Sequence, residues 1–168
     1  YQWNPLDCEH RFKCWGHWCS ADLVHWQHEP VGLMPDEEYD RNGCYSGSAV
    51  DNQGVLTLCY TGNVKFDDGS RTAWQCLAEE QPDGTFKKQG PVLALPEGYT
   101  GHVRDPKVWQ HDGLWNMVLG AQDLQKRGKL RLIKSADKPA SPTCADAPDD
   151  LPARIAVSRR QALADSGA

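Results

Sequence analysis

The sequence predicts an all-β chain of short antiparallel strands that are grouped in propeller-like units. Three observations support this fold class: apolar residues show no helical period before residue 138, β-like runs alternate with turn residues, and one strand–turn–strand pattern occurs twice. The first observation excludes a helical bundle, the second places the strands, and the third groups them.

Four apolar runs are predicted strands, and each lies beside a turn signal. Where the signal contains Asp-Gly or Asn-x-Gly, the glycine supplies the positive φ that a tight hairpin needs. The predicted strands are 55–60, 73–78, 114–119 and 130–133, and their turn signals end at Gly54, Gly84, Gly113 and Gly128.

One pattern occurs twice along the chain. The first copy of the pattern runs from a residue pair ending in Val50 through a polar turn and a strand to Gly62. The second copy runs from a residue pair ending in Val108 through a turn and a strand to Gly120. The offset is 58 between the two valines and 58 between the two closing glycines. A period of this length fits units of about four short strands, as in the blades of a β-propeller.

Composition and charge argue against two classes of function. The formal net charge of −5 disfavours a nucleic-acid partner, because phosphate contacts need clustered Lys and Arg. No apolar run approaches the roughly 20 residues that a membrane-spanning helix needs. The seven tryptophans are many for 168 residues, and Trp forms flat walls on which sugar rings stack as well as filling cores.

The cysteines indicate a reducing compartment. They are seven in number, scattered, and without a short repeated spacing. Such a set is more typical of reduced cytosolic thiols than of a disulfide framework, so we predict a cytoplasmic protein.

The composition changes after residue 137. Residues 138–168 contain no aromatic residue, four prolines and eight alanines. We therefore predict two segments, a β domain over 1–137 and an irregular tail over 138–168, with a possible short helix over 155–164. A shifted reading frame would produce the same change in composition, and neither reading gives the tail a chemical role.

Arg104-Asp105-Pro106 is a candidate site for chemistry. The neighbouring cation is expected to lower the pKa of Asp105 and keep it ionised, and the following Pro is expected to favour an extended Asp105. An ionised carboxylate suits the binding of hydroxyls and the stabilisation of an oxocarbenium-like transition state. An ordinary surface ion pair is the alternative.

The stretch from Gly43 to Ala49 is a second candidate. Small residues around Tyr45 allow a ligand to approach the backbone, and Ser46 offers a hydroxyl. A serine hydrolase is not supported, because the Gly-x-Ser-x-Gly elbow needs Gly where Cys44 stands. A glycine-rich turn leading into a strand remains the alternative. The acidic stretch 35–40 is expected to form a solvated loop.

The region from Cys8 to Cys19, rich in Cys and His, raises a zinc-stabilised domain as an alternative. No Cys-x-x-Cys pair occurs there, and the Cys and His positions do not form two matched pairs. We therefore predict no metal and no other cofactor. The alternation of Trp15, His17 and Cys19 fits one face of a strand equally well.

Read in order, the motifs resemble those of glycoside hydrolase family 32 over residues 1 to about 137. The matching stretches are Trp15-Gly16-His17, Ser20-Ala21-Asp22-Leu23-Val24-His25-Trp26, Pro35-Asp36-Glu37-Glu38, Gly43-Cys44-Tyr45-Ser46-Gly47-Ser48-Ala49, Tyr60-Thr61-Gly62-Asn63-Val64, Gln75-Cys76-Leu77-Ala78, Arg104-Asp105-Pro106-Lys107-Val108-Trp109 and Met117-Val118-Leu119-Gly120-Ala121. The resemblance implies roughly the first half of a five-bladed β-propeller, which in the family precedes a β-sandwich.

The resemblance also implies an activity and its residues. The family's β-fructofuranosidases cleave the terminal fructofuranoside of substrates such as sucrose or sucrose-6-phosphate with retention, so the expected partner is a small sugar. By position, Asp105 matches the carboxylate that holds fructose hydroxyls and stabilises the transition state. The implied substrate-binding residues are Gln2, Trp15, Tyr45, Ser46, Arg104 and Asp105.

Two family motifs are missing from this sequence. The nucleophile stands in an Asn-Asp-Pro motif, and Asn4-Pro5 lacks the Asp; the acid/base stands in a Glu-Cys-Pro motif, which does not occur. Retaining hydrolysis needs both carboxylates, so this chain alone is not expected to turn over substrate. A non-catalytic fructoside-binding module and a decayed gene product are the alternatives.

Overall fold

The computed structural model describes residues 1–136, and all regular secondary structure in that range is β-strand. Ten strands form three sheets in which every pairing of neighbouring strands is antiparallel. The expected all-β class is confirmed for this range. The tail over 138–168, with its possible helix, lies outside the described residues. Within residues 1–136 there is no helix long and apolar enough to cross a membrane.

Each sheet is a meander of strands that follow one another in the chain. The first sheet has the order β1-β2-β3, the second β4-β5-β6-β7, and the third β8-β9-β10. The strands are β1 Gln2–Trp3, β2 Cys14–Cys19, β3 Gln27–Leu33, β4 Cys44–Asn52, β5 Val55–Lys65, β6 Arg71–Glu80, β7 Phe86–Leu93, β8 Arg104–His111, β9 Leu114–Gln122 and β10 Gly128–Ser135.

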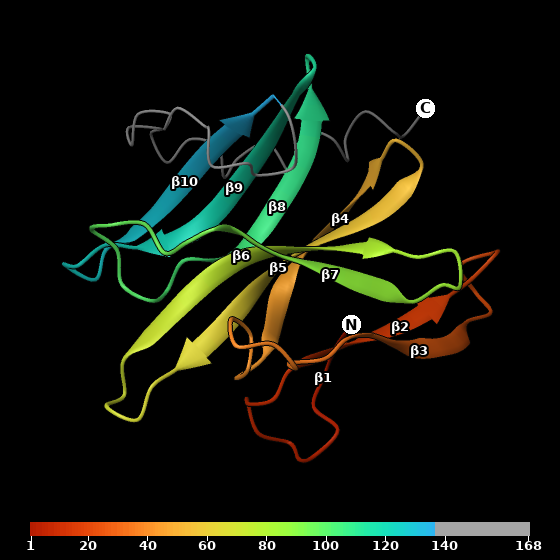
Figure 1. Ribbon diagram of the computed structural model, residues 1–168, viewed down its shortest axis with the longest axis horizontal. Helices are drawn as coiled ribbons and strands as arrows, with labels where there is room; N and C mark the ends of the chain where they lie inside the picture. Colours follow the sequence, from red (N-terminus) through yellow and green to blue (C-terminus); the bar gives the residue numbers. More distant parts are fainter. Residues whose placement is uncertain (137–168) are drawn as a thin grey trace, which may run out of the picture.

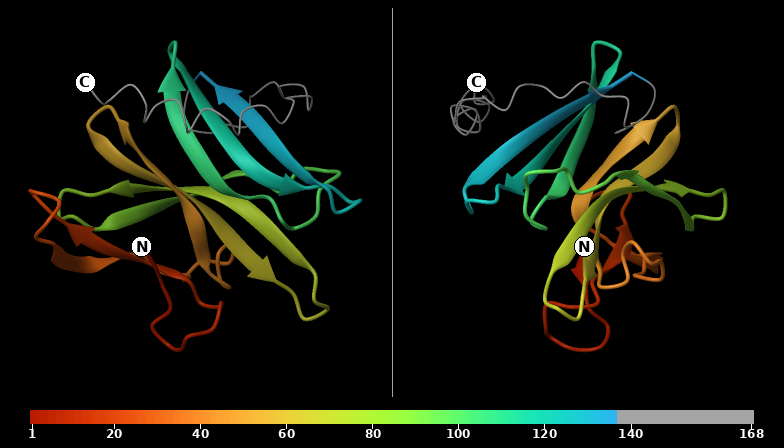
Figure 2. Two further views of the ribbon diagram at one scale, coloured as in Figure 1. Left: turned by 180° about the vertical axis from the view of Figure 1, so that it is seen from behind. Right: turned by 60° about the vertical axis from the view of Figure 1, so that its left-hand side comes forward.

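The four-stranded sheet lies between the other two. Figures 1 and 2 show the sheet of β8, β9 and β10 on one side of it and the sheet of β1, β2 and β3 on the other. The first strands of the second and third sheets, β4 and β8, are in contact. This arrangement places the start of each sheet near its neighbour and spreads the later strands outward.

The tight turns have the predicted backbone. Asn52 pairs with Val55, so the β4–β5 loop is Gln53-Gly54, with φ values of 55° and 86°. The β8–β9 loop is Asp112-Gly113, with φ values of 50° and 75°. Two consecutive positive φ values match the right-handed twist of the flanking strands. The two hairpins are the first two strands of successive sheets, which confirms the internal repeat.

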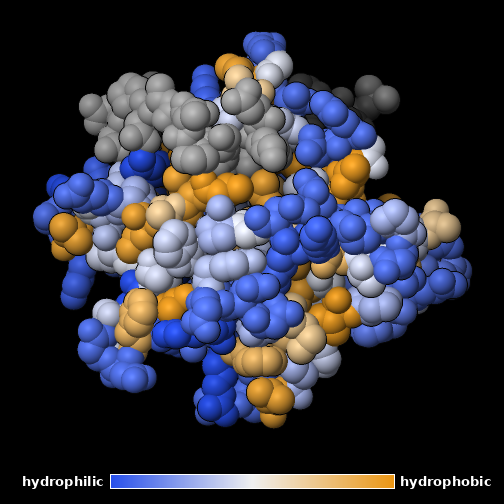
Figure 3. All heavy atoms as spheres, in the orientation of Figure 1, coloured by the Kyte–Doolittle hydropathy of each residue, from blue (hydrophilic) through white to orange (hydrophobic). Residues whose placement is uncertain are grey.

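Strand β5 contributes to both cores because its side chains alternate between two faces. Leu58 and Tyr60 pack in a cluster with Leu33 of the first sheet, whereas Cys59 packs in a cluster with Val108 of the third. A strand with both faces covered is apolar almost throughout, and Thr57–Val64 is buried without a break. The face drawn in Figure 3 is mostly hydrophilic, with apolar groups only in limited areas.

The six cysteines in the described range are free thiols. Burial raises the pKa of Cys59 and of Cys76 to about 12, so both stay uncharged and pack as small apolar groups.

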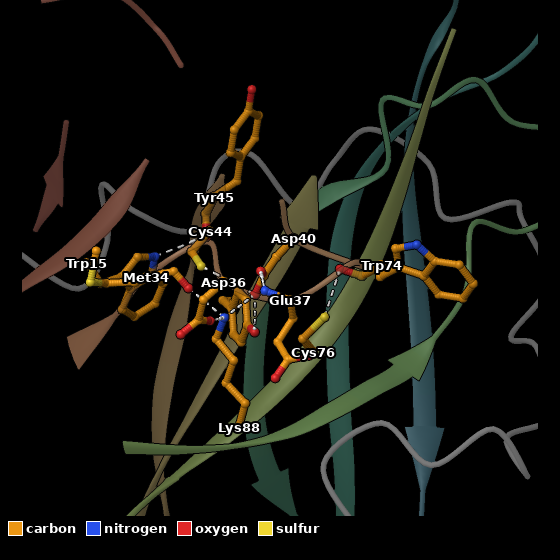
Figure 4. Close-up of polar contacts among 11 residues, drawn as sticks. Trp15, Met34, Asp36, Glu37, Asp40, Cys44, Tyr45, Trp74, Cys76 and Lys88 are labelled. Atoms are coloured by element: carbon orange, nitrogen blue, oxygen red, sulfur yellow. Dashed lines mark hydrogen bonds and ion pairs between the residues drawn. The ribbon is translucent and has the colours of Figure 1, made fainter. Parts of the chain in front are cut away.

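The acidic stretch 35–40 is not simply a solvated loop, which corrects the sequence-based expectation. Asp40 is fully buried, and the ammonium of Lys88 on β7 lies 2.5 Å from its Oδ2. The Lys88 nitrogen also donates to Asp36 and to the Met34 carbonyl. Figure 4 shows these groups converging on the lysine from the loop. The ion pair joins two segments 48 residues apart, so the loop sequence alone does not indicate it.

Other polar groups complete the surroundings of Asp40. The Tyr60 hydroxyl donates to its Oδ2 at 2.9 Å, and the Glu37 amide donates to Oδ1 at 3.0 Å. Burial opposes the charge on Lys88, but its hydrogen bonds to Asp36 and Asp40 outweigh burial and raise its pKa above the usual range. The buried charges therefore stabilise the loop only as a pair.

Replacing Lys88 by Met is expected to lower the free energy of unfolding by about 3–5 kcal/mol, because the fully buried Asp40 side chain would lose its cationic partner. Urea unfolding followed by tryptophan fluorescence measures this loss. The control is Lys87→Met at the exposed neighbouring position on β7, expected to change stability by less than about 0.5 kcal/mol. The double variant Asp40→Asn/Lys88→Met should recover part of the loss. Equal effects of the two lysine substitutions would contradict a buried ion pair.

Candidate active site

A cavity of about 720 Å³ lies where β1, β4 and β8 begin. It contains five of the six residues that the sequence predicts for the substrate site, and Trp15 is the one that it lacks. The lining residues are Gln2, His10, Lys13, Tyr45, Ser46, Lys65, Arg71, His102, Arg104 and Asp105. Residues separated by a hundred positions in the sequence therefore share one wall.

A β-bulge presents Asp105 to this cavity. Arg104 pairs with Gly120 and Lys107 with Val118, so β8 carries one residue more than β9 between these pairs. Asp105 has a φ of 63°, in the left-handed region. The extended conformation expected before Pro106 is therefore wrong, because the bulge sets the local backbone. Asp is among the few non-glycine residues enriched at positive φ, and such strained positions concentrate at functional sites.

Buried polar groups of the second sheet hold the bulge on one side. The Asp105 amide donates to Thr61 Oγ1 at 3.1 Å, and the Thr61 hydroxyl donates to Gln75 Oε1 at 2.8 Å. Gln75 in turn donates from Nε2 to the Val103 carbonyl at 3.1 Å. Thr61 and Gln75 are each 1% exposed, so these hydrogen bonds do not compete with water. The chain of bonds fixes the segment immediately before and at the bulge.

Ser48 of β4 holds the other side. Its hydroxyl donates to the Pro106 carbonyl at 2.9 Å and accepts from the Val108 amide at 3.0 Å. β8 is the edge strand of the third sheet, so backbone groups on its outer side have no partner in the ladder, and unpaired buried groups are costly. Ser48 supplies a partner to two backbone groups of β8. We use the term bulge clamp for Ser48, Thr61 and Gln75 together.

The pKa of Asp105 is shifted in the direction opposite to the expectation. Burial raises its pKa above the ordinary value, and Arg104 opposes this only partly, since its Nε lies 3.7 Å from Asp105 Oδ2. The sequence-based expectation of a lowered pKa is therefore wrong. The two side chains remain partly open to the cavity, at 39% exposed for Arg104 and 56% for Asp105.

His102 joins two guanidinium groups beside the carboxylate. Its Nδ1 lies 2.9 Å from Arg104 Nη1 and 3.4 Å from Arg71 Nη1. Burial lowers the pKa of His102, and the charges of Arg71 and Arg104 lower it further. Both arginines are obligatory donors, so Nδ1 is assigned as the acceptor of a neutral ring.

Residues of β1 and of the start of β4 also line the cavity. Tyr45 pairs with Thr61 and Gly47 with Tyr60, so Ser46 is the additional residue of a second bulge. The Gln2 amide donates from Nε2 to the Cys44 carbonyl at 3.2 Å. The Tyr45 ring points away from the Asp40–Lys88 pair (Figure 4).

Trp15 lies on a different surface. Its ring lines a second cavity, of about 480 Å³, together with Tyr1, Trp18 and Phe86 among others. Its indole N–H donates to the Tyr45 carbonyl at 3.2 Å. The structure therefore connects Trp15 to the backbone of the candidate site and does not bring its ring together with the other five residues.

Sequence reasoning did not single out Lys13, Lys65, Arg71 or His102, although all four line the cavity. None of them stands in a motif that indicates a site. His102 is the nearest to one, since it lies two positions before Arg104. Their proximity arises from strand pairing, since Lys65 ends β5 opposite Arg71 at the start of β6. In the part of the chain that the structure describes, no group of three or more His, Cys, Asp or Glu side chains is placed to hold a metal ion.

Residues 1–140 match the sequence model of the glycosyl hydrolases family 32 N-terminal domain. The chain belongs to glycoside hydrolase family 32. It is 79% identical over 137 residues to sucrose-6-phosphate hydrolase of Salmonella typhimurium, and 49% identical over 135 residues to that of Bacillus subtilis. These matches cover 82% and 80% of this chain, but 29% and 28% of the relatives.

Solved structures of family 32 enzymes share the fold. The sucrose-6-phosphate hydrolase of Lactobacillus gasseri matches with a TM-score of 0.79 and 35% identity, over 86% of this chain and 30% of that one. A Bombyx mori β-fructofuranosidase mutant in complex with sucrose matches with a TM-score of 0.74 and 33% identity, over 89% of this chain and 31% of that one. The three sheets are therefore part of a family 32 β-propeller, as expected from the resemblance.

Replacing Thr61 by Val is expected to lower the free energy of unfolding by about 1–3 kcal/mol, because the Asp105 amide and Gln75 Oε1 would lose a buried partner. The control is Thr57→Val, also buried on β5, whose hydroxyl bonds only to the nearby Val55 carbonyl. Urea unfolding compares the two variants. A loss at Thr61 no larger than at Thr57 would contradict the bulge clamp.

Acid is expected to weaken the fold through His102. A histidine with a lowered folded pKa binds fewer protons in the folded chain than in the unfolded chain. Stability is therefore lost as pH falls below the ordinary histidine value of about 6.5 and towards the lower folded value. The free energy of unfolding, measured from pH 7.5 to pH 5, should fall less steeply in His102→Gln. Parallel curves would show that His102 is not the group responsible.

Proposed function

We propose that this chain supplies the fructose-binding wall and the transition-state-stabilising carboxylate of a β-fructofuranosidase. The proposed reaction is retaining hydrolysis of the terminal fructofuranoside of sucrose or sucrose-6-phosphate. One observation carries the proposal: a clamped, strained bulge presents Asp105 to a cavity that Gln2, Tyr45 and Ser46 also line. The names of the relatives give the substrate class.

The role proposed for Asp105 follows from its chemistry. Departure of the leaving sugar from the fructosyl group builds positive charge on the fructosyl anomeric carbon and ring oxygen, and a fixed carboxylate nearby stabilises that charge. The same carboxylate is proposed to accept hydrogen bonds from fructose hydroxyls. Partial burial of Asp105 strengthens both interactions, because fewer water molecules screen them. Arg104 Nε lies 3.7 Å from Asp105 Oδ2, and its positive charge favours the ionised carboxylate.

Gln2, Tyr45 and Ser46 are proposed to orient the sugar. Ser46 and Gln2 offer a hydroxyl and an amide, and Tyr45 offers an aromatic ring, which is the usual combination in a sugar site. Trp15 is proposed to act indirectly, since its indole supports the Tyr45 carbonyl. The nucleophile and the acid/base are proposed to come from segments outside this sequence. The free thiols support a cytoplasmic location for the enzyme.

The test is an exchange enzyme, in which the matched segment of this chain replaces the corresponding 137 residues of the Salmonella typhimurium relative. The high identity makes the new junctions compatible with both partners. We expect release of fructose from sucrose-6-phosphate. A folded exchange enzyme without turnover would reject the proposal, and fructoside binding by that inactive protein would favour a non-catalytic binding module.

Replacing Asp105 by Asn in the exchange enzyme is expected to lower kcat/KM about 100- to 1,000-fold, as when one charge-stabilising group is removed from an active site. Asn accepts the positive φ, and removing a partly buried charge should leave the unfolding free energy unchanged or higher. The control is Asp112→Asn, the same substitution at a positive-φ residue in the exposed β8–β9 turn. Steady-state kinetics and urea unfolding are measured for both. Equal activities would remove Asp105 from the mechanism.

A further inference from the structure

The candidate active site carries a charge opposite to that of the whole chain. Four cationic side chains line the cavity, Lys13, Lys65, Arg71 and Arg104, against the single carboxylate of Asp105. With a neutral His102, four positive charges and one negative charge leave +3 at the cavity, whereas the chain has a formal net charge of −5. A local excess of this size attracts an anion and raises its concentration at the site.

The excess positive charge has no internal partner. Within residues 1–136, the side chains of Lys13, Lys65 and Arg71 form no ion pair. Some cations elsewhere in the same range do have partners, such as Arg11 with Asp7, Arg41 with Glu38, Lys88 with Asp40, and Arg127 with Asp123. Exposed lysines outside the cavity, among them Lys87, Lys107 and Lys134, form no ion pair within that range either. The cavity differs from the rest of the described surface in gathering three such cations around one hollow.

Arg71 is held in place by packing. A Cβ added at Gly101 would lie 2.2 Å from Arg71 Cγ and 2.6 Å from the Arg71 carbonyl oxygen, so only glycine leaves room for this side chain. The guanidinium group then meets His102 Nδ1, which it shares with Arg104. Two guanidinium groups thus converge on one neutral atom, with only Arg104 close to a carboxylate. Their mutual repulsion is relieved when an anion binds between them.

We propose that Arg71 and Lys65, with Lys13 beside them, form a subsite for a phosphate monoester carried by the sugar substrate. The inference rests on the proposed function and deepens it, since it explains how the site distinguishes a phosphorylated disaccharide from a plain one. Arginine presents a planar fork of donors that matches phosphate oxygens, and lysine adds a point charge. A dianion offsets most of the +3 charge.

The cations divide into two groups by position. Arg104 neighbours Asp105 in sequence and contacts its carboxylate, so it belongs to the fructose-binding part of the site. Arg71 and Lys65 come from β6 and β5 at the far end of their hairpin, and they pair across the strands. A substrate whose fructosyl group contacts Asp105 would extend its phosphate towards this pair. Arg71 also contacts His102 beside Arg104, whereas the Lys65 side chain has no hydrogen bond or ion pair to that part of the site. Loss of Lys65 should therefore affect only the phosphorylated substrate.

The experiment compares sucrose-6-phosphate with sucrose in the exchange enzyme and in its Arg71→Met and Lys65→Met variants. Methionine keeps an unbranched apolar stem over Gly101 and removes the charge. We expect kcat/KM for sucrose-6-phosphate to fall about 10- to 100-fold in each variant, as for a lost charge-assisted hydrogen bond, and kcat/KM for sucrose to change less than about threefold in Lys65→Met. The control is Lys134→Met, an exposed lysine on β10 that does not line the cavity.

Inorganic phosphate serves as a second probe, because it separates free phosphate from phosphate attached to the sugar. It should inhibit the unaltered exchange enzyme competitively and inhibit Arg71→Met several-fold more weakly. Equal losses on both substrates, or no loss on either, would overturn the phosphate subsite and leave the proposed hydrolase standing. An exchange enzyme inactive on both substrates would reject the hydrolase itself. If Arg71→Met lowers the melting temperature strongly, the exposed Lys65 position decides the outcome.

Discussion

The contact between the second and third sheets depends on the bulge clamp. Ser48, Thr61 and Gln75 come from β4, β5 and β6, and each meets the backbone of the segment 103–108. Apolar packing between sheets is tolerant of small shifts, whereas hydrogen bonds to named backbone atoms are not. The clamp therefore fixes the register between two sheets and, through it, the position of Asp105 relative to Ser46 and Gln2.

The candidate site carries a positive net charge, whereas the net charge of the whole chain is negative. Burial raises the pKa of Asp105, and two arginines share the neutral ring of His102. A folded chain tolerates such an arrangement only where the surrounding structure is stable, because like charges and partly buried ions both weaken it. The cores on both sides of β5 and the buried Asp40–Lys88 pair provide that stability at a distance from the cavity.

Local sequence patterns predicted four of the ten strands and several of the turns, because alternation and positive-φ residues act over a few positions. Gln53-Gly54 and Asp112-Gly113 form the expected hairpin turns, whereas at the last turn signal Gly128 already begins β10. The same reasoning failed wherever a distant partner decides the outcome: Asp40 is buried because of Lys88, and Asp105 is left-handed because of a bulge. All six predicted site residues came from family motifs, and five of them line one cavity, whereas Arg71 and Lys65 required strand pairing to be known.

The two bulges have a consequence for how such a site can change over time. Ser46 and Asp105 both stand near the start of the first strand of a sheet, each as part of an insertion into an otherwise regular hairpin. The turn and strand residues of the hairpins that follow determine how each sheet folds, so the side chain at each bulge is not needed for folding. The second and third sheets thus each offer one replaceable position to a shared centre. New specificities could arise by altering a single repeat, without any change in how the other repeats fold or pack.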